Sequence, residues 1–303
     1  MQSINIWPKI SIITPSFNQG EYLEQTILSV YGQEYPNLEY IIIDGGSSDN
    51  SIDIIKKHEK KLTYWISEKD NGQAHAINKG FARATGDILA WLNSDDIYMP
   101  NSLFLMAKEY LNQFEDSNII YFGNCIHYRE SKTELYSSGS NVILSSQKFN
   151  LNICDYIIQP SAFWTKKVWQ EVGILNEDLN YTFDWEWFLR VQKKRFRFKS
   201  INNVFSLYRF HDSHKTSNGG AQRKNEIYHI FTQFASLDIA NLYNDMSIDL
   251  NIKINRNLKD VIKRNLILKL HKNIGPISFL KKVKPKYYGK YNNAILEGLW
   301  NMI

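Results

Sequence analysis

The sequence predicts an α/β protein whose first part forms a Rossmann-like, mostly parallel sheet flanked by helices. Between residue 10 and about residue 118, short apolar runs alternate with segments of helical periodicity, which is the pattern of βαβ units. Three of the apolar runs end in polar residues, as strands do when they deliver side chains to a ligand at one edge of a sheet. After about residue 118 a more mixed region follows, and about the last 80 residues form a helical extension by pattern.

Four buried strands are expected in the first part, because each run is short, continuously apolar and bounded by turn residues. They are Ile10–Thr14, Leu38–Asp44, Leu62–Ser67 and Asp87–Asn93. The segments between them carry apolar residues at helical spacing and typical capping residues. The expected helices are Tyr22–Tyr31, a helix from Ser48 or Asp49 through His58, Gln73–Ala84 and a helix opened by Pro100.

The mixed region contains shorter signals. Strands are expected at Ile119–Phe122, Ile126–Tyr128, Glu134–Tyr136 and Val204–Phe210, and helices at Lys166–Val172 and Asp184–Lys194. In the extension, breaks fall at Gly219-Gly220 and Gly275-Pro276. The expected domains are therefore residues 1–217, with halves of about 8–117 and 118–217, and the helical extension 218–303.

The composition is that of an ordinary globular chain, with 43% hydrophobic and 22% charged residues. No apolar run approaches the length of about 18 residues that a transmembrane helix needs, so none is expected. The N-terminus lacks the pattern of a secretory signal, which indicates a cytoplasmic location. Cys125 and Cys154 show no metal-ligand spacing and are expected to be free thiols.

The charge is unevenly placed. Residues 251–303 carry 12 basic side chains against two acidic ones, a net of +10, whereas the whole chain has a net of +5, which leaves −5 for residues 1–250. A mildly acidic body argues against nucleic acid as a partner. The basic extension suggests peripheral contact of residues 251–303 with an anionic membrane, because Leu258, Val261, Ile262, Leu266 and Leu270 fall on one helical face. The alternative is a helix packed on the rest of the protein with a solvated basic face.

Polar residues follow three of the expected parallel strands. The first strand leads into Pro15-Ser16-Phe17-Asn18, the second into Asp44-Gly45-Gly46 and the fourth into Asn93-Ser94-Asp95-Asp96. In an open parallel sheet these carboxyl ends meet at the ligand-binding edge. The adjacent carboxylates of Asp95 and Asp96 suit Mg²⁺ or Mn²⁺, which take one or two carboxylates together with water and phosphate oxygens. The alternative is a solvated turn that caps the next helix.

Two further positions on this edge favour a nucleotide ligand. The carboxylate of Asp44 can accept a hydrogen bond from a base or a ribose, although it can also cap the following helix. Asp70-Asn71-Gly72-Gln73 opens a helix that carries Lys79 and Arg83, either of which can reach a phosphate. A solvated helix face explains these two cations equally well.

Aromatic residues surround two carboxylates in the segment Phe183–Arg190. Glu186 pairs with Arg190 at i,i+4 spacing, which gives Glu186 a structural role. Asp184 lies at the helix start among apolar neighbours, where partial desolvation raises a carboxyl pKa toward that of a general base. The alternative is a helix cap. Near residue 210, His211, His214, Arg209 and Lys215 crowd a strand end and can bind a diphosphate or a metal.

These motifs, in this order, resemble the family-2 glycosyltransferases, which have the GT-A fold and act with inversion. The resemblance rests on ISIITPSFNQGEYLEQTILSVYGQEYPNLEYIIIDGGSSDNS, on ISEKDNGQAHAINKGFARATGDILAWLNSDD, and on the looser QPSAFW and FDWEWFLR segments. It covers roughly residues 8–215. It implies a GT-A catalytic domain with a donor half and an acceptor half.

The resemblance also implies roles for single residues. It places Pro15, Ser16 and Asn18 in the nucleotide pocket and Asp44 on the base. It puts Asn93, Ser94 and Asp95 at the Asp-x-Asp position, with Asp95, helped by Asp96, as the metal ligand. It makes Asp184 the catalytic base and places His211 on the diphosphate or the metal. Lys79 is expected on a phosphate. Two departures stand out, because Asn93 replaces the usual first aspartate and Phe183 stands where an acidic residue often precedes the base.

The expected function is an inverting glycosyltransferase that moves a sugar from a nucleotide-diphosphate sugar, UDP- or dTDP-linked, to a hydroxyl of a glycan or lipid-linked acceptor. Bacterial surface polysaccharide biosynthesis is the expected setting, from the resemblance alone. The alternative is a non-catalytic sugar-nucleotide-binding subunit of a larger synthase. A nucleotidyltransferase is disfavoured, because the loop PSFNQGEY after the first strand contains no Lys or Arg.

Overall fold

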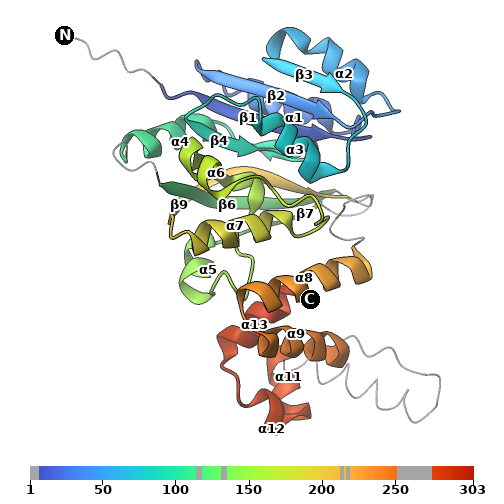
Figure 1. The fold of residues 1–303 in the computed structure, drawn as a ribbon, viewed down its shortest axis with the longest axis vertical. Helices are drawn as coiled ribbons and strands as arrows, with labels where there is room; N and C mark the ends of the chain where they lie inside the picture. The colour runs from blue at the N-terminus through green and yellow to red at the C-terminus, as the bar shows by residue number, and fades with distance from the viewer. Residues whose placement is uncertain (1–6, 114–117, 131–134, 212–214, 216–218, 251–274) are drawn as a thin grey trace. The chain divides into compact units, whose positions relative to one another are not determined.

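The computed structural model describes residues 7–113, 118–130, 135–211, 215, 219–250 and 275–303 (Figure 1). The chain divides into two compact units. Unit 1 consists of Met1–Leu144 and Ile157–Asn218, and unit 2 of Ser145–Tyr156 and Gly219–Ile303. The sequence placed residues 145–156 with the catalytic domain, whereas their contacts place them in the second unit.

Unit 1 contains the expected alternation of strands and helices. Its first elements are β1 (Ile10–Ser16), α1 (Leu23–Tyr31), β2 (Leu38–Asp44), α2 (Ser51–Lys57), β3 (Tyr64–Ser67), α3 (Gln73–Phe81), β4 (Ile88–Trp91), β5 (Ile97–Tyr98) and α4 (Ser102–Leu111). The later elements are β6 (Ile119–Glu130), β7 (Leu135–Gly139), α5 (Val142–Lys148), β8 (Ala162–Thr165), α6 (Lys166–Val172), α7 (Phe183–Lys193) and β9 (Arg197–Phe210). Of these, α5 runs across the boundary into unit 2.

The strands of the described residues form one mixed sheet in the order β3-β2-β1-β4-β8-β6-β9-β5, with β7 on β6. The first four are mutually parallel and form a run of neighbours in Figure 1. Strand β8 is antiparallel to both β4 and β6, and β6 is parallel to β9. The expectation of a mostly parallel α/β sheet followed by a mixed region is confirmed.

Successive residues of β1 face opposite sides of the sheet, and each side is covered. Ile10 and Ile12 join a buried cluster with residues of α1, α2 and α4. Ile13 faces α3 so closely that a Cβ on Gly80 would lie 2.3 Å from its Cγ2 atom. A parallel strand that is buried on both faces has apolar residues at successive positions. This is why these strands could be recognised in the sequence as continuous apolar runs.

A cluster of aromatic rings packs between α3, β4, β8, α6 and α7. Its members are Phe81, Trp91, Trp164, Trp169 and Trp187, whose neighbouring ring centroids lie 4.3–6.3 Å apart. All five side chains are buried. Large buried aromatic side chains dominate core energetics, so this cluster fixes α7 against the sheet.

Strands β6 and β9 are longer than expected. The sequence predicted two short strands, at Ile119–Phe122 and Ile126–Tyr128, and a strand beginning only at residue 204. Instead β6 runs through Gly123 and pairs with β9, with irregular register around Asn124. A Cβ at Gly123 would lie 2.2 Å from Phe205, so this glycine permits close packing of the paired strands.

Unit 2 is helical among its described residues. Its helices are α8 (Gly220–Phe234), α9 (Leu237–Leu250), α11 (Pro276–Val283), α12 (Pro285–Tyr288) and α13 (Asn293–Met302). The predicted amphipathic face at residues 258–270 lies outside the described residues. Within the described part of the chain, no helix combines the length and the apolar character needed to cross a bilayer.

Candidate active site

The loops after β1 and β2 are bound to each other through Asp44 and Asn18. The Asp44 carboxylate is buried and accepts hydrogen bonds from the backbone of Gly46 and Ser47 and from the hydroxyls of Ser47 and Ser67, at 2.6–3.1 Å. Ser47 in turn accepts a hydrogen bond from the backbone N–H of Asn18, 2.8 Å away. These contacts make Asp44 a residue that shapes the loop. Its predicted direct contact with a base stays a prediction, which would use the acceptor positions that these hydrogen bonds leave.

Asn18 has a similar positioning role. Its φ angle of 51° lies in the left-handed region, which asparagine tolerates better than most residues. Its side-chain oxygen accepts hydrogen bonds from the backbone N–H and the hydroxyl of Ser48, at 2.8 and 3.3 Å. The loop after β1 is therefore fixed in one conformation.

Ser16 and Phe17 are the residues of this loop that remain available to a ligand. Ser16 is buried, and its hydroxyl has no hydrogen-bond partner among the described residues. An unsatisfied buried hydroxyl costs about 1–3 kcal/mol, which a ligand that pairs with it would remove. Phe17, the next residue in the chain, is 58% exposed, whereas a ring this large is normally buried. The sequence prediction included Ser16 but missed Phe17, whose signal was an aromatic residue at a polar strand end.

Asp95 and His211 meet at the ends of β4 and β9. The Asp95 Oδ2 atom lies 3.0 Å from His211 Nε2, and the His211 ring packs on Tyr22 with centroids 4.5 Å apart. Arg209 donates a hydrogen bond from Nε to the Asp95 carbonyl, 3.1 Å away. Two predicted site residues that lie 116 positions apart in sequence are thus in direct contact.

Asp96 does not face the same space as Asp95. Its carboxyl is 1% exposed and accepts hydrogen bonds from the Arg209 backbone N–H and from Asn93 Nδ2, both at 3.2 Å. Burial, and next the neighbouring Asp95 charge, raise the pKa of Asp96 well above its ordinary value. These contacts give Asp96 a structural role in holding the loop after β4, and its predicted contact with a metal stays a prediction.

Asn93 belongs to a chain of amides rather than to the Asp95–His211 pair. It donates from Nδ2 to Gln159 Oε1 as well as to Asp96, and its Oδ1 accepts a hydrogen bond from Gln73 Nε2, 2.8 Å away. An aspartate at position 93 would place a second carboxylate against the buried Asp96, whereas the asparagine supplies a donor. The neighbouring Ser94 fixes the loop through its carbonyl, which accepts a hydrogen bond from Thr26 Oγ1 at 2.9 Å.

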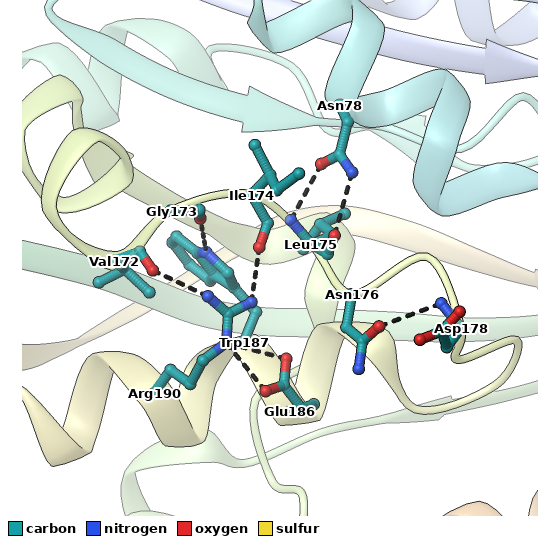
Figure 2. A network of polar contacts seen from close by, with 10 residues as sticks. All are labelled: Asn78, Val172, Gly173, Ile174, Leu175, Asn176, Asp178, Glu186, Trp187 and Arg190. Carbon is teal, nitrogen blue, oxygen red and sulfur yellow. Dashed lines mark hydrogen bonds and ion pairs between the residues drawn. The ribbon is translucent and has the colours of Figure 1, made fainter.

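Helix α7, which carries Asp184, is held by the network shown in Figure 2. Arg190 contacts the Glu186 carboxylate at 2.9 and 3.0 Å and donates to the carbonyls of Val172 and Ile174. Asn78 of α3 exchanges two hydrogen bonds with the backbone of Leu175. The segment from residue 172 to residue 175 therefore ties α7 to α3. The predicted Glu186–Arg190 pair is confirmed.

Asp184 lies in the first turn of α7 and is half-buried. Its Oδ1 atom accepts a hydrogen bond from the Trp185 backbone N–H. The ring of the preceding residue, Phe183, lies 5.5 Å from the ammonium of Lys215, which also contacts Gln73 Oε1 at 3.1 Å. A short chain of contacts thus joins the start of α7 to Asn93 at the end of β4.

The structure places the two remaining predicted residues away from these contacts. The Lys79 ammonium forms an ion pair with Glu68, so its positive charge is already matched. Pro15 lies inside β1, opposite Ile43 of β2, and sets the direction of the strand end. For these two residues, direct ligand contact stays a prediction.

The donor atoms at the Asp95–His211 pair fit a divalent cation. Among the described residues no group of three His, Cys, Asp or Glu side chains gathers in one place. Mg²⁺ and Mn²⁺ sites of this kind use one or two protein ligands and complete their shell with water and substrate phosphates. Among the described residues of this edge, the Asp95 carboxylate and the His211 imidazole have atoms of the kind that bind such a cation.

The sheet has four parallel strands, a mixed second half and a polar edge, which is the arrangement of the GT-A fold of glycosyltransferases. Comparison with solved structures confirms this fold for the chain. The Staphylococcus aureus protein TarS, residues 1–349, in complex with UDP-GlcNAc, superposes with a TM-score of 0.61 at 13% identity, over 97% of this chain and 89% of that one. The mannosyltransferase PcManGT from Pyrobaculum calidifontis, in complex with GDP-Man and Mn²⁺, gives 0.58 at 14% identity, over 98% and 88%.

The chain belongs to glycosyl transferase family 2, whose model matches residues 11–169. An uncharacterized glycosyltransferase of Rickettsia typhi is 28% identical over 69% of this chain. That match spans 66% of the relative's own length. The resemblance read from the motifs is thereby confirmed at the level of family and fold.

Proposed function

We propose that the protein is an inverting glycosyltransferase that transfers a sugar from a nucleotide-diphosphate sugar to an acceptor hydroxyl. Family membership and the GT-A fold support the reaction class. The observation that carries the proposal is the contact of Asp95 with His211 at the edge where β1, β2 and β4 end. That pair supplies the ligand atoms that a diphosphate-bound cation requires.

In the proposed reaction, the acceptor oxygen bonds to the anomeric carbon of the sugar. The bond from that carbon to the diphosphate oxygen breaks, and the nucleoside diphosphate leaves with the bonding electrons. Asp184 takes the proton of the acceptor hydroxyl, a role that contributes about 10²–10⁴-fold. One displacement from the opposite face inverts the anomeric carbon. Asp95 and His211 would hold a Mg²⁺ or Mn²⁺ ion, and the positive charge of that ion would stabilise the leaving diphosphate.

The nucleotide is proposed to bind in the loop after β1. The Phe17 ring offers a stacking surface for the base, and the Ser16 hydroxyl offers a hydrogen-bonding partner. Asp44 and Asn18 hold this loop in place. We expect a UDP- or dTDP-linked donor, and GDP-linked donors belong in the same screen because the solved relatives hold UDP-GlcNAc and GDP-Man.

The Asp184→Asn variant tests the assignment of the base. We expect transfer and donor hydrolysis to fall by at least about 100-fold, while the affinity for the nucleoside diphosphate, measured by calorimetry with Mn²⁺, stays within about twofold. The matched control is Asp178→Asn, an exposed aspartate in the turn before α7. If wild type binds the nucleotide but turns over at the same rate as Asp184→Asn, the alternative gains support: a non-catalytic sugar-nucleotide-binding subunit of a larger synthase.

The proposed acceptor is a glycan or a lipid-linked saccharide of bacterial surface polysaccharide biosynthesis, and the proposed location is the cytoplasm, with peripheral membrane contact. Four exposed lysines in unit 2 support that contact. They are Lys282, Lys284, Lys286 and Lys290, which lie in and around α11 and α12. Each basic residue near an anionic surface contributes about 1 kcal/mol.

Vesicle sedimentation tests the membrane contact. We expect the full chain to sediment with vesicles that contain phosphatidylglycerol and not with pure phosphatidylcholine. Replacing the four lysines with glutamine weakens this binding, whereas replacing the exposed Lys56, Lys57, Lys60 and Lys61 of unit 1 does not. Equal binding by both quadruple variants contradicts the assignment of the surface.

A further inference from the structure

The loop that carries Asp95 lies against the end of strand β9. Strand β5 begins directly after this loop and pairs with β9, with Ile97 opposite Leu207. Arg209 and His211 follow Leu207 at the second and fourth positions along the chain. Side chains two residues apart in an extended chain point to the same side. The end of β9 therefore directs Arg209 and His211 toward the loop of Asp95.

Arg209 and His211 contact Asp95 at two different groups. Arg209 Nε donates to the Asp95 carbonyl at 3.1 Å, whereas His211 Nε2 lies 3.0 Å from the carboxylate atom Oδ2. The backbone N–H of Arg209 also donates to Asp96 Oδ1 at 3.2 Å. A ligand residue whose backbone is held has less conformational freedom to lose when a cation binds, and this favours binding.

The start of helix α1 fixes the Arg209 side chain in turn. Arg209 Nη2 donates to Gln25 Oε1 at 2.6 Å, and its Cζ atom lies 5.0 Å from the centroid of the Tyr22 ring. The same ring packs on His211, with centroids 4.5 Å apart. A planar guanidinium can donate from two edges and stack on an aromatic face at the same time, which an ammonium cannot do. These three contacts together are therefore specific to arginine.

We propose that Arg209 is a positioning residue, which holds Asp95 and His211 in the arrangement that binds a divalent cation. This inference rests on the proposed function, in which that pair forms the cation site. Arg209 acts through the Asp95 backbone and through the Tyr22 ring. Its charge alone would weaken the binding of a nearby cation, because like charges repel. Removing the side chain should therefore weaken cation binding if its contacts matter most, and strengthen it if its charge does.

The test measures how much Mn²⁺ raises the affinity for a nucleoside diphosphate. Calorimetry with the full chain compares UDP, dTDP and GDP, each in Mn²⁺ and in EDTA. For a diphosphate that wild type binds, the ratio of the two affinities is the gain from the cation. We expect Arg209→Met to lower this gain about 10- to 100-fold, or to abolish a smaller one, because losing a residue that holds a metal ligand weakens metal binding by that factor. The affinity in EDTA should stay unchanged.

Two further variants separate the geometry of Arg209 from its charge. Arg209→Lys keeps the positive charge without the planar fork, so it should lose most of the gain as well. Gln25→Leu removes only the contact with Nη2 and should lower the gain less. Arg195→Met is the matched control, because Arg195 is exposed before the opposite end of β9 and should leave both affinities unchanged. Circular dichroism checks that each variant is folded; if Arg209→Met is not, Arg209→Lys and Gln25→Leu decide the test.

A gain that is unchanged or larger in Arg209→Met, or unchanged in Arg209→Lys, overturns this inference. Equal loss of affinity in Mn²⁺ and in EDTA also overturns it, because it indicates direct contact of Arg209 with the diphosphate. Both results leave the proposed function intact. A wild-type protein that binds a diphosphate equally well in Mn²⁺ and in EDTA overturns the inference together with the proposed cation site. One that binds none of the three diphosphates overturns the inference and the proposed function.

Discussion

The aspartates that follow β2 and β4 differ in role because their surroundings differ. The carboxylates of Asp44 and Asp96 are buried and satisfied by the loops that they hold, whereas the side chain of Asp95 keeps 18% exposure and meets His211. From the sequence alone, all three carboxylates were expected to contact a ligand, Asp44 the base and Asp95, helped by Asp96, the metal. Their partners lie between two and 116 residues away, so only the folded chain separates them.

Phe17 gives a prediction at this scale. Stacking of a base on an aromatic ring contributes about 1–3 kcal/mol, so Phe17→Ala should weaken nucleoside diphosphate binding about 5- to 100-fold and leave the melting temperature unchanged. Phe17→Tyr should retain the affinity, since the ring remains. Leu28→Ala removes another exposed apolar side chain, on α1, and serves as the control. Unchanged affinity in Phe17→Ala would exclude the ring from the nucleotide pocket.

Glu39 gives a second prediction, on pH. Burial raises the pKa of this β2 carboxyl, but hydrogen bonds from Ser11, Thr85 and Lys9 outweigh burial and lower the pKa to about 2. A lowered pKa stabilises the folded state above the ordinary value near 4.5, and that stability is lost as the pH falls toward 2.

Urea unfolding of Glu39→Gln checks this sign. At pH 7 the variant should be less stable than wild type by about 2–3 kcal/mol. The difference should shrink steadily between about pH 4.5 and pH 2, the range over which the wild-type carboxylate takes up its proton. A difference that stays constant over this range contradicts the hydrogen-bonding account of Glu39.

At the scale of elements, the sequence identified most strands and helices of the first half because buried parallel strands and amphipathic helices have distinct periods. The sequence prediction divided β6 and shortened β9. A glycine and a polar stretch resemble the ends of a strand when the partner strand is unknown. The amide chain through Gln73 and Asn93 was equally unreadable, since it depends on which faces of α3 and β4 meet. The family motifs named the candidate residues, and the folded chain shows which of them contact one another.

The contact of helix α3 with strand β1 gives a prediction about the packing of secondary-structure elements. A Cβ on Gly80 would lie 2.3 Å from Ile13 Cγ2, so Gly80→Ala must push α3 away from the sheet. Overpacking of this kind costs about 1–3 kcal/mol. We therefore expect a lower melting temperature, measured by circular dichroism. Gly139→Ala is the control, because no atom lies within 4 Å of the added methyl group.

At the scale of the whole molecule, the division into units gives a prediction about truncation. Residues 145–156 belong to unit 2, where Asn152 donates to the Phe234 carbonyl and a Cβ on Gly298 would lie 2.9 Å from Ile153. A chain that ends at Asn218 exposes this segment, so it should aggregate more and melt at a lower temperature than the full chain. The same truncation with residues 145–156 replaced by a Gly-Ser linker of equal length should be monomeric by light scattering. Equal aggregation of the two truncated chains would contradict the assignment of the segment.

The interrupted connectivity of unit 2 also bears on the order of biosynthesis. Its segment 145–156 leaves the ribosome before residues 157–218, and its helical partners follow only after them. Contacts between parts so distant in sequence form late, because the loop-closure entropy must be overcome first. The nascent chain therefore carries Leu151 and Cys154, which are buried in the folded unit, without their partners until synthesis is nearly complete, and during that interval we expect it to depend on chaperones.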